Sequence, residues 1–518
     1  MRLPSTLSAL LLGSAFFSPL LFAATSLGSN DSAAISNVQS EPVRQALDAF
    51  KAGDVKRAVE LAKPLADKGD REAIYLMGFA YETGKGVEAS REKALENYRK
   101  AAELKQKDAS YRLSFILLAS QKKEEREEAR AMLEKAAKDD PAVAGRILGE
   151  AYLRGLVGEK ADVDKAVGWW QSAANAGDIP SLIFLGSFYE GQYGFPEKKD
   201  LKKSLESFKK AADLGDNGAM ASLGSRLLSG DPSIRNEKEG RVWLQKAIEA
   251  KQYSAYLVLG DYEENVKKDL KAALAEYERG KDAGQLECTL RCADFYIQGK
   301  GVPKDAERGI ALLEKSATAG SPAAHLRLAG LKLNGEKPDI TAGYKHLVAA
   351  ANGGLPEAQN ELGLFYLSGK LQANDVVAAA SWFTRAAKAN NASAQANLGV
   401  LAERGAGIDQ SFETAAQLYT LAANQGNGPA TLALARLLAA GSGVKADPPK
   451  AWALATLAGE RGMEDGQKLA GELAAKFDSQ QLAEAKKQLA EIKATKPKTA
   501  ESTKESPKET KAPASKKK

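Results

Sequence analysis

Hydrophobic and polar positions repeat along this chain with a period of about 36 residues. A small or polar residue closes each period, a small side chain follows four residues later, and an apolar one, usually Leu, comes four residues after that. The closing residues are Gly69, Lys105, Asp140, Gly177, Gly215, Lys251, Gly284, Gly320, Gly354, Asn390, Gly426 and Gly462. Steps of three and four residues put these side chains on one face of an α-helix. Each period therefore predicts an amphipathic helix, which we call helix A.

Glycine recurs inside helix A at the ninth position after the closing residue, as at Gly149 and Gly363. An interior Gly destabilises a helix by about 1 kcal/mol relative to Ala. Its recurrence at one position therefore predicts that a neighbouring helix approaches closely there. Gly-x-Gly pairs such as Gly84 and Gly86 follow several of these helices, and they predict where each helix ends.

A second helix, helix B, is predicted between the end of helix A and the next closing residue. It carries bulky side chains seven or eight residues before that closing residue, as at Trp170 and Phe208, and often an Ala pair near its end. Such a helical hairpin can bury its apolar face only against other hairpins. The pattern therefore predicts an all-α fold, an α/α right-handed superhelical solenoid of about a dozen helical hairpins. Its last helix is predicted to start at Asp478 or Ser479.

The repeated order Ala-x3-Leu-Gly-x2-Tyr-x2-Gly-x-Gly-Val-x4-Asp-x2-Lys-Ala-x2-Trp-x3-Ala-Ala-x2-Gly resembles the Sel-1-like repeat, a branch of the tetratricopeptide-repeat (TPR) superfamily. One period carries it at Gly149, Tyr152, Gly155, Asp164, Lys165, Ala166, Trp169, Ala173, Ala174 and Gly177. The resemblance covers residues 54–471 and implies Sel-1-like/TPR-like hairpins whose inner groove is lined mainly by helix A. The periods that follow Lys105 and Lys251 lack the Gly pair, so their loops depart from the family pattern.

The two ends of the chain differ in composition from the repeats. Arg2, the apolar residues 7–22 and a small-residue site ending at Ala23 are typical of a secretory signal. The alternative is an N-terminal membrane anchor, against which Pro19 and the short apolar stretch argue. We therefore expect a signal peptide (1–23), a flexible lead (24–40), the repeat solenoid (41–492) and a disordered Lys-rich tail (493–518). The expected location is periplasmic or secreted in a bacterium, with no transmembrane segment in the mature chain.

The charge of the protein is concentrated in this tail. Residues 493–518 contain nine Lys and three Glu, and the resulting net charge of +6 equals that of the whole chain. The repeats are therefore nearly neutral, which argues against a nucleic-acid partner. The tail either tethers the protein to an anionic envelope polymer or lipid, or only keeps it soluble.

The sequence offers no catalytic or metal-binding constellation. Cys288 and Cys292 are four residues apart on one predicted helix, where Cβ atoms about 5–6 Å apart are too distant for a disulfide. We expect both to be buried apolar side chains. His325 and His346 are the two histidines, and without further ligands they predict neither a metal site nor a cofactor. Since no Ser/His/Asp or Cys/His pairing is visible either, the sequence predicts that the protein is not an enzyme.

A polar position on helix A, seven residues after the closing residue, is the candidate partner-binding surface. The predicted contact residues are Arg112, Arg291, Arg327, Glu361 and Asn397, together with His325. The most polar part is expected in the periods between Gly284 and Asn390, where Gln359 is also expected to be exposed. The alternative is a solvated face without a partner.

These features predict a non-enzymatic protein–protein interaction scaffold, or adaptor, of the bacterial envelope that binds protein partners in the concave groove of the solenoid. Exported members of the resembled family are often similar to assembly factors for secretion or exopolysaccharide machinery. The alternative is a cell-wall or polysaccharide-binding protein tethered by its basic tail. A third hypothesis, a glycan hydrolase or β-lactam-cleaving enzyme, has no residues that support it.

Overall fold

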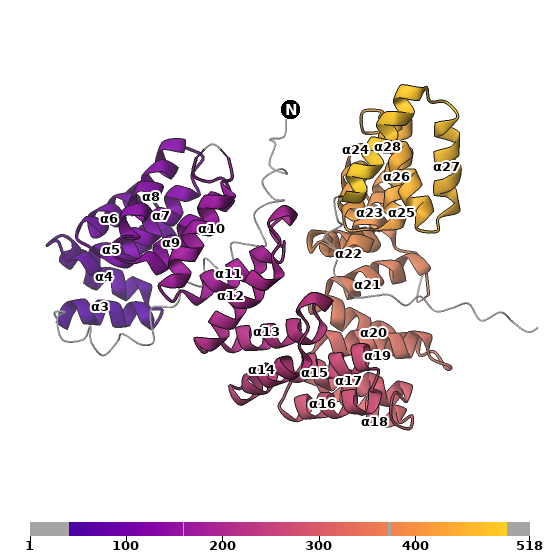
Figure 1. The fold of residues 1–518 in the computed structure, drawn as a ribbon, viewed down its shortest axis with the longest axis horizontal. Helices are drawn as coiled ribbons and strands as arrows, with labels where there is room; N and C mark the ends of the chain where they lie inside the picture. Colours follow the sequence, from indigo (N-terminus) through magenta and orange to yellow (C-terminus); the bar gives the residue numbers. More distant parts are fainter. Residues whose placement is uncertain (1–40, 159, 371–373, 495–518) are drawn as a thin grey trace, which may run out of the picture. The chain divides into compact units, whose positions relative to one another are not determined.

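The computed structural model describes residues 41–158, 160–370 and 374–494, and within these ranges it consists of helices and their connections, without a strand (Figure 1). The all-α helical-repeat fold predicted from the sequence is confirmed. The predicted signal peptide and lead lie outside the described residues, as does the predicted tail from residue 495 onward.

Helices of type A and type B alternate along the described chain. The A helices are α3 (Glu41–Lys51), α5 (Arg71–Thr83), α7 (Lys107–Leu118), α9 (Pro141–Leu153), α11 (Ile179–Tyr189), α13 (Asn217–Ser229), α15 (Ala255–Tyr262), α17 (Leu286–Gln298), α19 (Pro322–Asn334), α21 (Pro356–Ser368), α23 (Ala392–Arg404), α25 (Gly428–Ala440) and α27 (Glu464–Ala474). The B helices are α4 (Val55–Ala66), α6 (Arg91–Glu103), α8 (Lys123–Ala136), α10 (Val163–Asn175), α12 (Leu201–Asp213), α14 (Glu237–Glu249), α16 (Leu270–Asp282), α18 (Ala306–Thr318), α20 (Ile340–Asn352), α22 (Val376–Lys388), α24 (Phe412–Asn424), α26 (Pro448–Glu460) and α28 (Ser479–Ala494).

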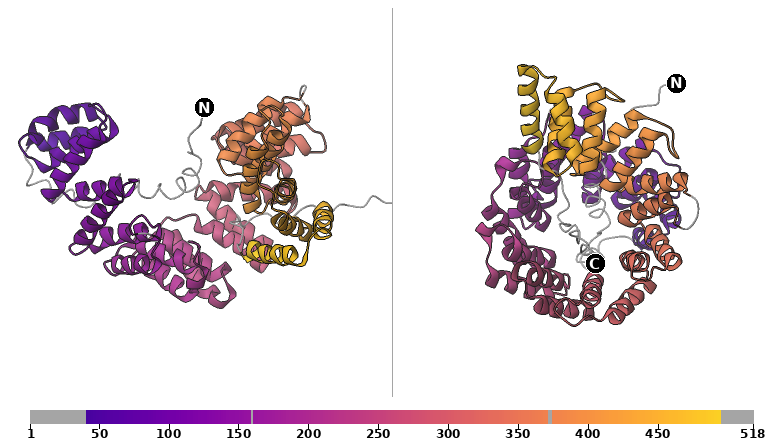
Figure 2. Two further views of the ribbon diagram at one scale, coloured as in Figure 1. Left: turned by 90° about the horizontal axis from the view of Figure 1, so that it is seen from above. Right: turned by 90° about the vertical axis from the view of Figure 1, so that its right-hand side faces the viewer.

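The chain divides within α15 into two compact units, Met1–Val258 and Leu259–Lys518. In the first unit each helix from α3 to α14 packs on the next one in the chain, and in the second the same holds from α16 to α27. Figure 2 shows the hairpins of each unit following one another in chain order. Each unit is therefore a quasi-one-dimensional stack, in which a hairpin contacts mainly its neighbours.

The Gly position in the middle of helix A is explained by an aromatic ring from helix B of the same hairpin. A Cβ atom on Gly149 would lie 2.4 Å from the Trp170 ring, and one on Gly363 would lie 2.6 Å from the Phe383 ring. Non-bonded contacts this short essentially never occur at Cβ atoms in proteins. The predicted close approach of a neighbouring helix is confirmed, and its partner is the large side chain that marks helix B.

The ends of the helices also follow the sequence pattern. Gly441 ends α25 in the left-handed conformation with φ 71°, as its place in a Gly-x-Gly pair predicts. The period that follows Lys251 lacks this pair, and there α15 continues into the π-helix η3 (Glu263–Lys267) and ends at Lys268 with φ 60°. At the other end of the second unit, α28 begins at Ser479, and the Asp478 carboxylate accepts a hydrogen bond of 2.7 Å from the backbone N–H of Gln481. The predicted start of the last helix is therefore confirmed.

Candidate functional site

Arg112, the predicted contact residue of the first unit, forms an ion pair with the neighbouring hairpin. On α7, its guanidinium donates two hydrogen bonds to the Glu82 carboxylate on α5, from Nε at 2.9 Å and from Nη2 at 2.6 Å. The Tyr98 hydroxyl on α6 donates to the same carboxylate at 2.7 Å. Hydrogen bonding to Glu82 raises the pKa of Arg112, and burial together with Glu82 raises the pKa of Tyr98. Arg112 thus joins two neighbouring hairpins.

The Arg residues of the second unit also pair with the preceding helix A. Arg327 on α19 donates from Nε to the Asp294 carboxylate on α17 at 3.1 Å. Arg291 on α17 lies 3.7 Å from the Asp261 carboxylate on α15. Glu287 lies between the two guanidinium groups, 3.7 Å from Arg291 and 3.3 Å from Arg327. We call these five residues the acid–Arg ladder.

The ladder follows a simple rule in the repeat. An acid ten residues after one closing residue, such as Asp261 or Asp294, faces an Arg seven residues after the next closing residue. At the following step the two positions are occupied by Gly330 on α19 and Glu361 on α21. Neither the acid nor the Arg is present there, and no atom lies within 4 Å of the place where a Cβ on Gly330 would be. The ladder therefore ends at an open position.

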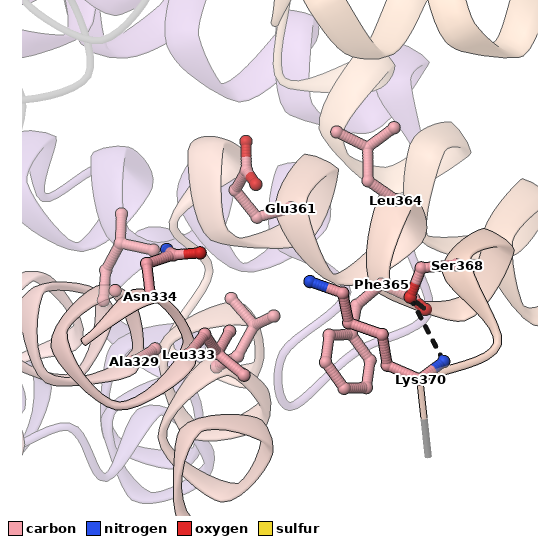
Figure 3. Close-up of a pocket in the computed structure, with 11 residues that line it drawn as sticks. Ala329, Leu333, Asn334, Glu361, Leu364, Phe365, Ser368 and Lys370 are labelled. Atoms are coloured by element: carbon pink, nitrogen blue, oxygen red, sulfur yellow. Dashed lines mark hydrogen bonds between the residues drawn. The ribbon is translucent and has the colours of Figure 1, made fainter. Parts of the chain in front are cut away.

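A pocket of about 450 Å³ lies at this open position. Its lining comes from α19, α20, α21 and the residues just beyond α21, and consists of Leu326, Ala329, Gly330, Leu333, Asn334, Leu347, Glu361, Leu364, Phe365, Ser368 and Lys370. Figure 3 shows Leu333 of α19 and Phe365 of α21 on the two sides of the pocket, with Glu361 at its upper edge and the Lys370 side chain extending toward the space between them. Apolar side chains make up the larger part of the lining, and Asn334, Glu361, Ser368 and Lys370 add polar groups.

Glu361 and Lys370 are the charged residues of the pocket, and both are exposed. Across residues 41–158, 160–370 and 374–494, neither side chain forms an ion pair or a side-chain hydrogen bond. The backbone N–H of Lys370 donates to the Ser368 hydroxyl at 3.3 Å, which holds the end of α21 (Figure 3). Two opposite charges are thus available beside an apolar pocket, in contrast to the paired charges of the ladder.

The other predicted residues are engaged with neighbouring helices. Asn397 on α23 donates from Nδ2 to the Oδ1 of the buried Asn360 on α21 at 2.9 Å. His325 on α19 and His346 on α20 share a hydrogen bond of 2.9 Å between their Nδ1 atoms, so one ring donates and the other accepts. Burial and the neighbouring His325 lower the pKa of His346. Neither Asn397 nor His325 lines the pocket.

The expectation that Gln359 is exposed was wrong. Gln359 is buried, and its side-chain amide donates to the backbone carbonyl of Ala351 at the end of α20 at 3.2 Å. Its position, one residue after the small side chain at Ala358, faces helix B of the preceding hairpin rather than solvent. Sequence analysis also missed Lys370 and the apolar walls, although Gly330 at a position occupied by Asp in two preceding periods was a readable signal.

Both cysteines are buried and unpaired, as predicted, and burial raises the pKa of Cys288 to about 11 and that of Cys292 to about 12. Within the described part of the chain, no three His, Cys, Asp or Glu side chains are placed to hold a metal ion. None of the helices described in residues 41–494 combines the length and the hydropathy that crossing a membrane requires.

Comparison with known proteins gives the family of these repeats. The family model described as "Sel1 repeat" matches residues 71–105, 107–141, 146–178, 179–216, 218–251, 286–321, 322–355, 356–391, 392–427 and 428–463. The unmatched residues 252–285 include the hairpin with the π-helix.

Three similar proteins illustrate the range of relatives. The chain is 28% identical over 260 residues to the chitin synthase regulator SKT5 of Saccharomyces cerevisiae, covering 47% of this chain and spanning 37% of that protein's length. It is 34% identical over 160 residues to the Sel1-repeat-containing protein YjcO of Escherichia coli, covering 30% of this chain and 69% of that protein. The crystal structure of a protective antigen of uropathogenic Escherichia coli with an SLR fold is 24% identical, with a TM-score of 0.45, and the match covers 87% of this chain and 99% of that one.

Proposed function

The chain belongs to the Sel1 repeat family, and from this premise we propose that it is a non-enzymatic scaffold of the bacterial envelope that holds protein partners on the helix A side of its repeats. Sel1 repeat proteins generally mediate protein–protein interactions and are typically non-catalytic. A repeat stack suits this role because its surface is extended and continuous from one hairpin to the next.

The pocket between α19 and α21 is the observation that carries the proposal. The charged side chains of the acid–Arg ladder pair within the chain, whereas Glu361 and Lys370 stand beside the apolar side chains of the pocket with no ion-pair partner among the described residues. Protein interfaces combine a buried apolar centre with a polar rim. The pocket has both parts, and it lies in the segment between Gly284 and Asn390 where partner contacts were expected.

Two further observations support the proposal. The N-terminal sequence has the charge and hydropathy of an export signal, which favours the envelope over the cytoplasm. Two fungal relatives are described as a regulator and a regulatory factor of chitin synthase, which is the role of a protein that acts on another protein. We extend only this adaptor role to the present chain.

Affinity capture from bacterial envelope extract tests the proposed function. We expect the full mature chain to retain a reproducible set of proteins, and a variant that lacks residues 493–518 to retain the same set. Purified protein should show no turnover of peptidoglycan or β-lactam substrates. Capture of no protein, together with sedimentation on isolated cell wall that depends on residues 493–518, would replace the scaffold by the polysaccharide-binding alternative.

A further inference from the structure

The end of the acid–Arg ladder creates a site with a defined chemistry. At the two preceding steps, an Arg on one helix A neutralises an Asp on the helix A before it. At the third step Glu361 replaces the Arg, and Gly330 removes the side chain that would face it. The carboxylate of Glu361 has no ion-pair partner among the described residues, and both Gly330 and Glu361 line the pocket.

We propose that this pocket binds an extended peptide segment of a partner protein, through an apolar side chain that is flanked by a basic residue on one side and an acidic residue on the other. The apolar side chain enters between Leu333 and Phe365, the basic group pairs with Glu361, and the acidic group pairs with Lys370. This inference rests on the proposed scaffold function and names the kind of partner segment that the scaffold takes.

The size and walls of the pocket fit an apolar anchor. Its volume of about 450 Å³ lies within the range of roughly 300–1,000 Å³ that binding pockets show. Leu326, Leu333, Leu364 and Phe365 supply apolar contacts, and Leu364 is 39% exposed in the free protein. Large apolar side chains that fill such pockets carry most of the binding energy of many interfaces. An aromatic or Leu side chain is therefore the expected anchor.

The charges of the pocket select the charges on either side of the anchor. Glu361 lies in the middle of α21 and Lys370 just beyond its end, and the two side chains form no ion pair with each other. Charges at an interface determine orientation and specificity more than affinity. A peptide with acidic residues on both sides of the anchor would place like charges together at Glu361, and one with basic residues on both sides would do so at Lys370.

Selection from a displayed library of random octapeptides tests this inference on the full-length protein. We expect enrichment of sequences in which Leu, Phe, Tyr or Trp lies between an acidic and a basic residue. Such peptides, made synthetically and labelled, should bind the wild type in fluorescence anisotropy at least tenfold more tightly than peptides with Ser in place of the anchor.

Two sets of variants make the test specific. Gly330→Leu fills the pocket, meets no atom within 4 Å at its Cβ, and should weaken binding at least tenfold. Gly471→Leu on α27 is the matched control, because no atom lies within 4 Å of its Cβ position either, and it should leave binding unchanged. The charge reversal Glu361→Lys should favour peptides with acidic residues on both sides of the anchor.

The outcomes separate this inference from the proposed function. If no peptide is enriched, or if Gly330→Leu and Glu361→Lys leave binding unchanged while circular dichroism shows an intact fold, the peptide site is wrong. The scaffold function still stands in that case if the wild type and Gly330→Leu capture the same envelope proteins. If capture fails altogether, the scaffold function fails independently of the pocket.

Discussion

Two neighbouring glycines of the second unit predict opposite effects of the same substitution. Gly330 on α19 and Gly363 on α21 both lie inside a helix, so replacing either by Ala should stabilise its helix by about 1 kcal/mol. A Cβ on Gly330 would meet open space, whereas one on Gly363 would lie 2.6 Å from the Phe383 ring. We therefore expect Gly330→Ala to stabilise the protein and Gly363→Ala to lose this gain.

The size of the difference follows from the packing around Phe383. This ring is fully buried, so it cannot turn toward solvent, and it must move about 0.8 Å to reach the 3.4 Å at which ordinary contacts begin. Overpacking of a well-filled core costs about 1–3 kcal/mol. Since the helix-propensity gain is the same at both positions, the two variants should differ by about 1–3 kcal/mol in local stability.

Native-state hydrogen exchange is the suitable assay, because a repeat stack opens in local segments with separate free energies. Amides of α19 should exchange more slowly in Gly330→Ala than in the wild type. Amides of α21 and α22 in Gly363→Ala should exchange faster than the gain in helix propensity alone would predict. Gly363→Ala should be less destabilising when it is made in the Phe383→Leu variant than when it is made in the wild type, because the ring that the new Cβ meets is then absent. If Gly363→Ala protects α21 as much as Gly330→Ala protects α19, the ring does not explain the Gly position.

Three further predictions concern individual side chains. Replacing Arg112 by Met should destabilise the junction of α5 and α7 by about 1.5–3 kcal/mol in urea unfolding, because the partly buried Glu82 loses a charged hydrogen-bond partner, whereas Arg44→Met, at an exposed pair, should change little. The pKa of His346 is lowered below its ordinary value of 6.5, so the unfolded chain binds more protons than the folded one as the pH falls. The contribution of His346 to the stability of the α19–α20 hairpin should therefore be complete above pH 6.5 and decrease as the pH drops toward the lowered pKa. His346→Gln should flatten this pH profile in hydrogen exchange, and an unchanged profile would contradict the reasoning. Cys288 and Cys292, with pKa values raised to about 11 and 12 by burial, should react with iodoacetamide at pH 8 only after urea is added, and labelling of the native protein would show that they are accessible.

The repeat itself could be predicted from the sequence because its signals are local and periodic. The Gly inside helix A, the bulky side chain of helix B and the cap at Asp478 each depend on neighbours within one hairpin, and the structure confirms them. The candidate site depends on contacts between hairpins, and the sequence of a single repeat does not show which residues of the next repeat it contacts. Arg291 and Arg327 are polar positions on helix A, as expected, but whether an acid of the preceding helix neutralises them is settled only by reading two periods together.

The pocket was harder to predict for the same reason. Its apolar lining comes from three helices, and Leu364 differs little from any other Leu of the repeat when the sequence is read alone. Glu361 was identified as a polar position, but the open position beside it depends on Gly330, which lies one period earlier. Gln359 shows the opposite error, because a polar side chain in a helix was expected to be exposed and instead bonds to a buried backbone carbonyl.

The acid–Arg ladder gives each hairpin a polarity, like the two ends of a monomer in a growing polymer. Helix α17 carries both halves of the pair, Arg291 toward the preceding hairpin and Asp294 toward the following one. A tandem copy of the α17–α18 hairpin would therefore find its own partner, and the ladder would lengthen by one step. Helix α19 pairs with the preceding Asp294 through Arg327 but has only Gly330 at the position that faces the next hairpin. The ladder therefore ends at α19. A tandem copy of the α19–α20 hairpin would repeat the empty position, and the Arg of the copy would face Gly330 instead of an acid.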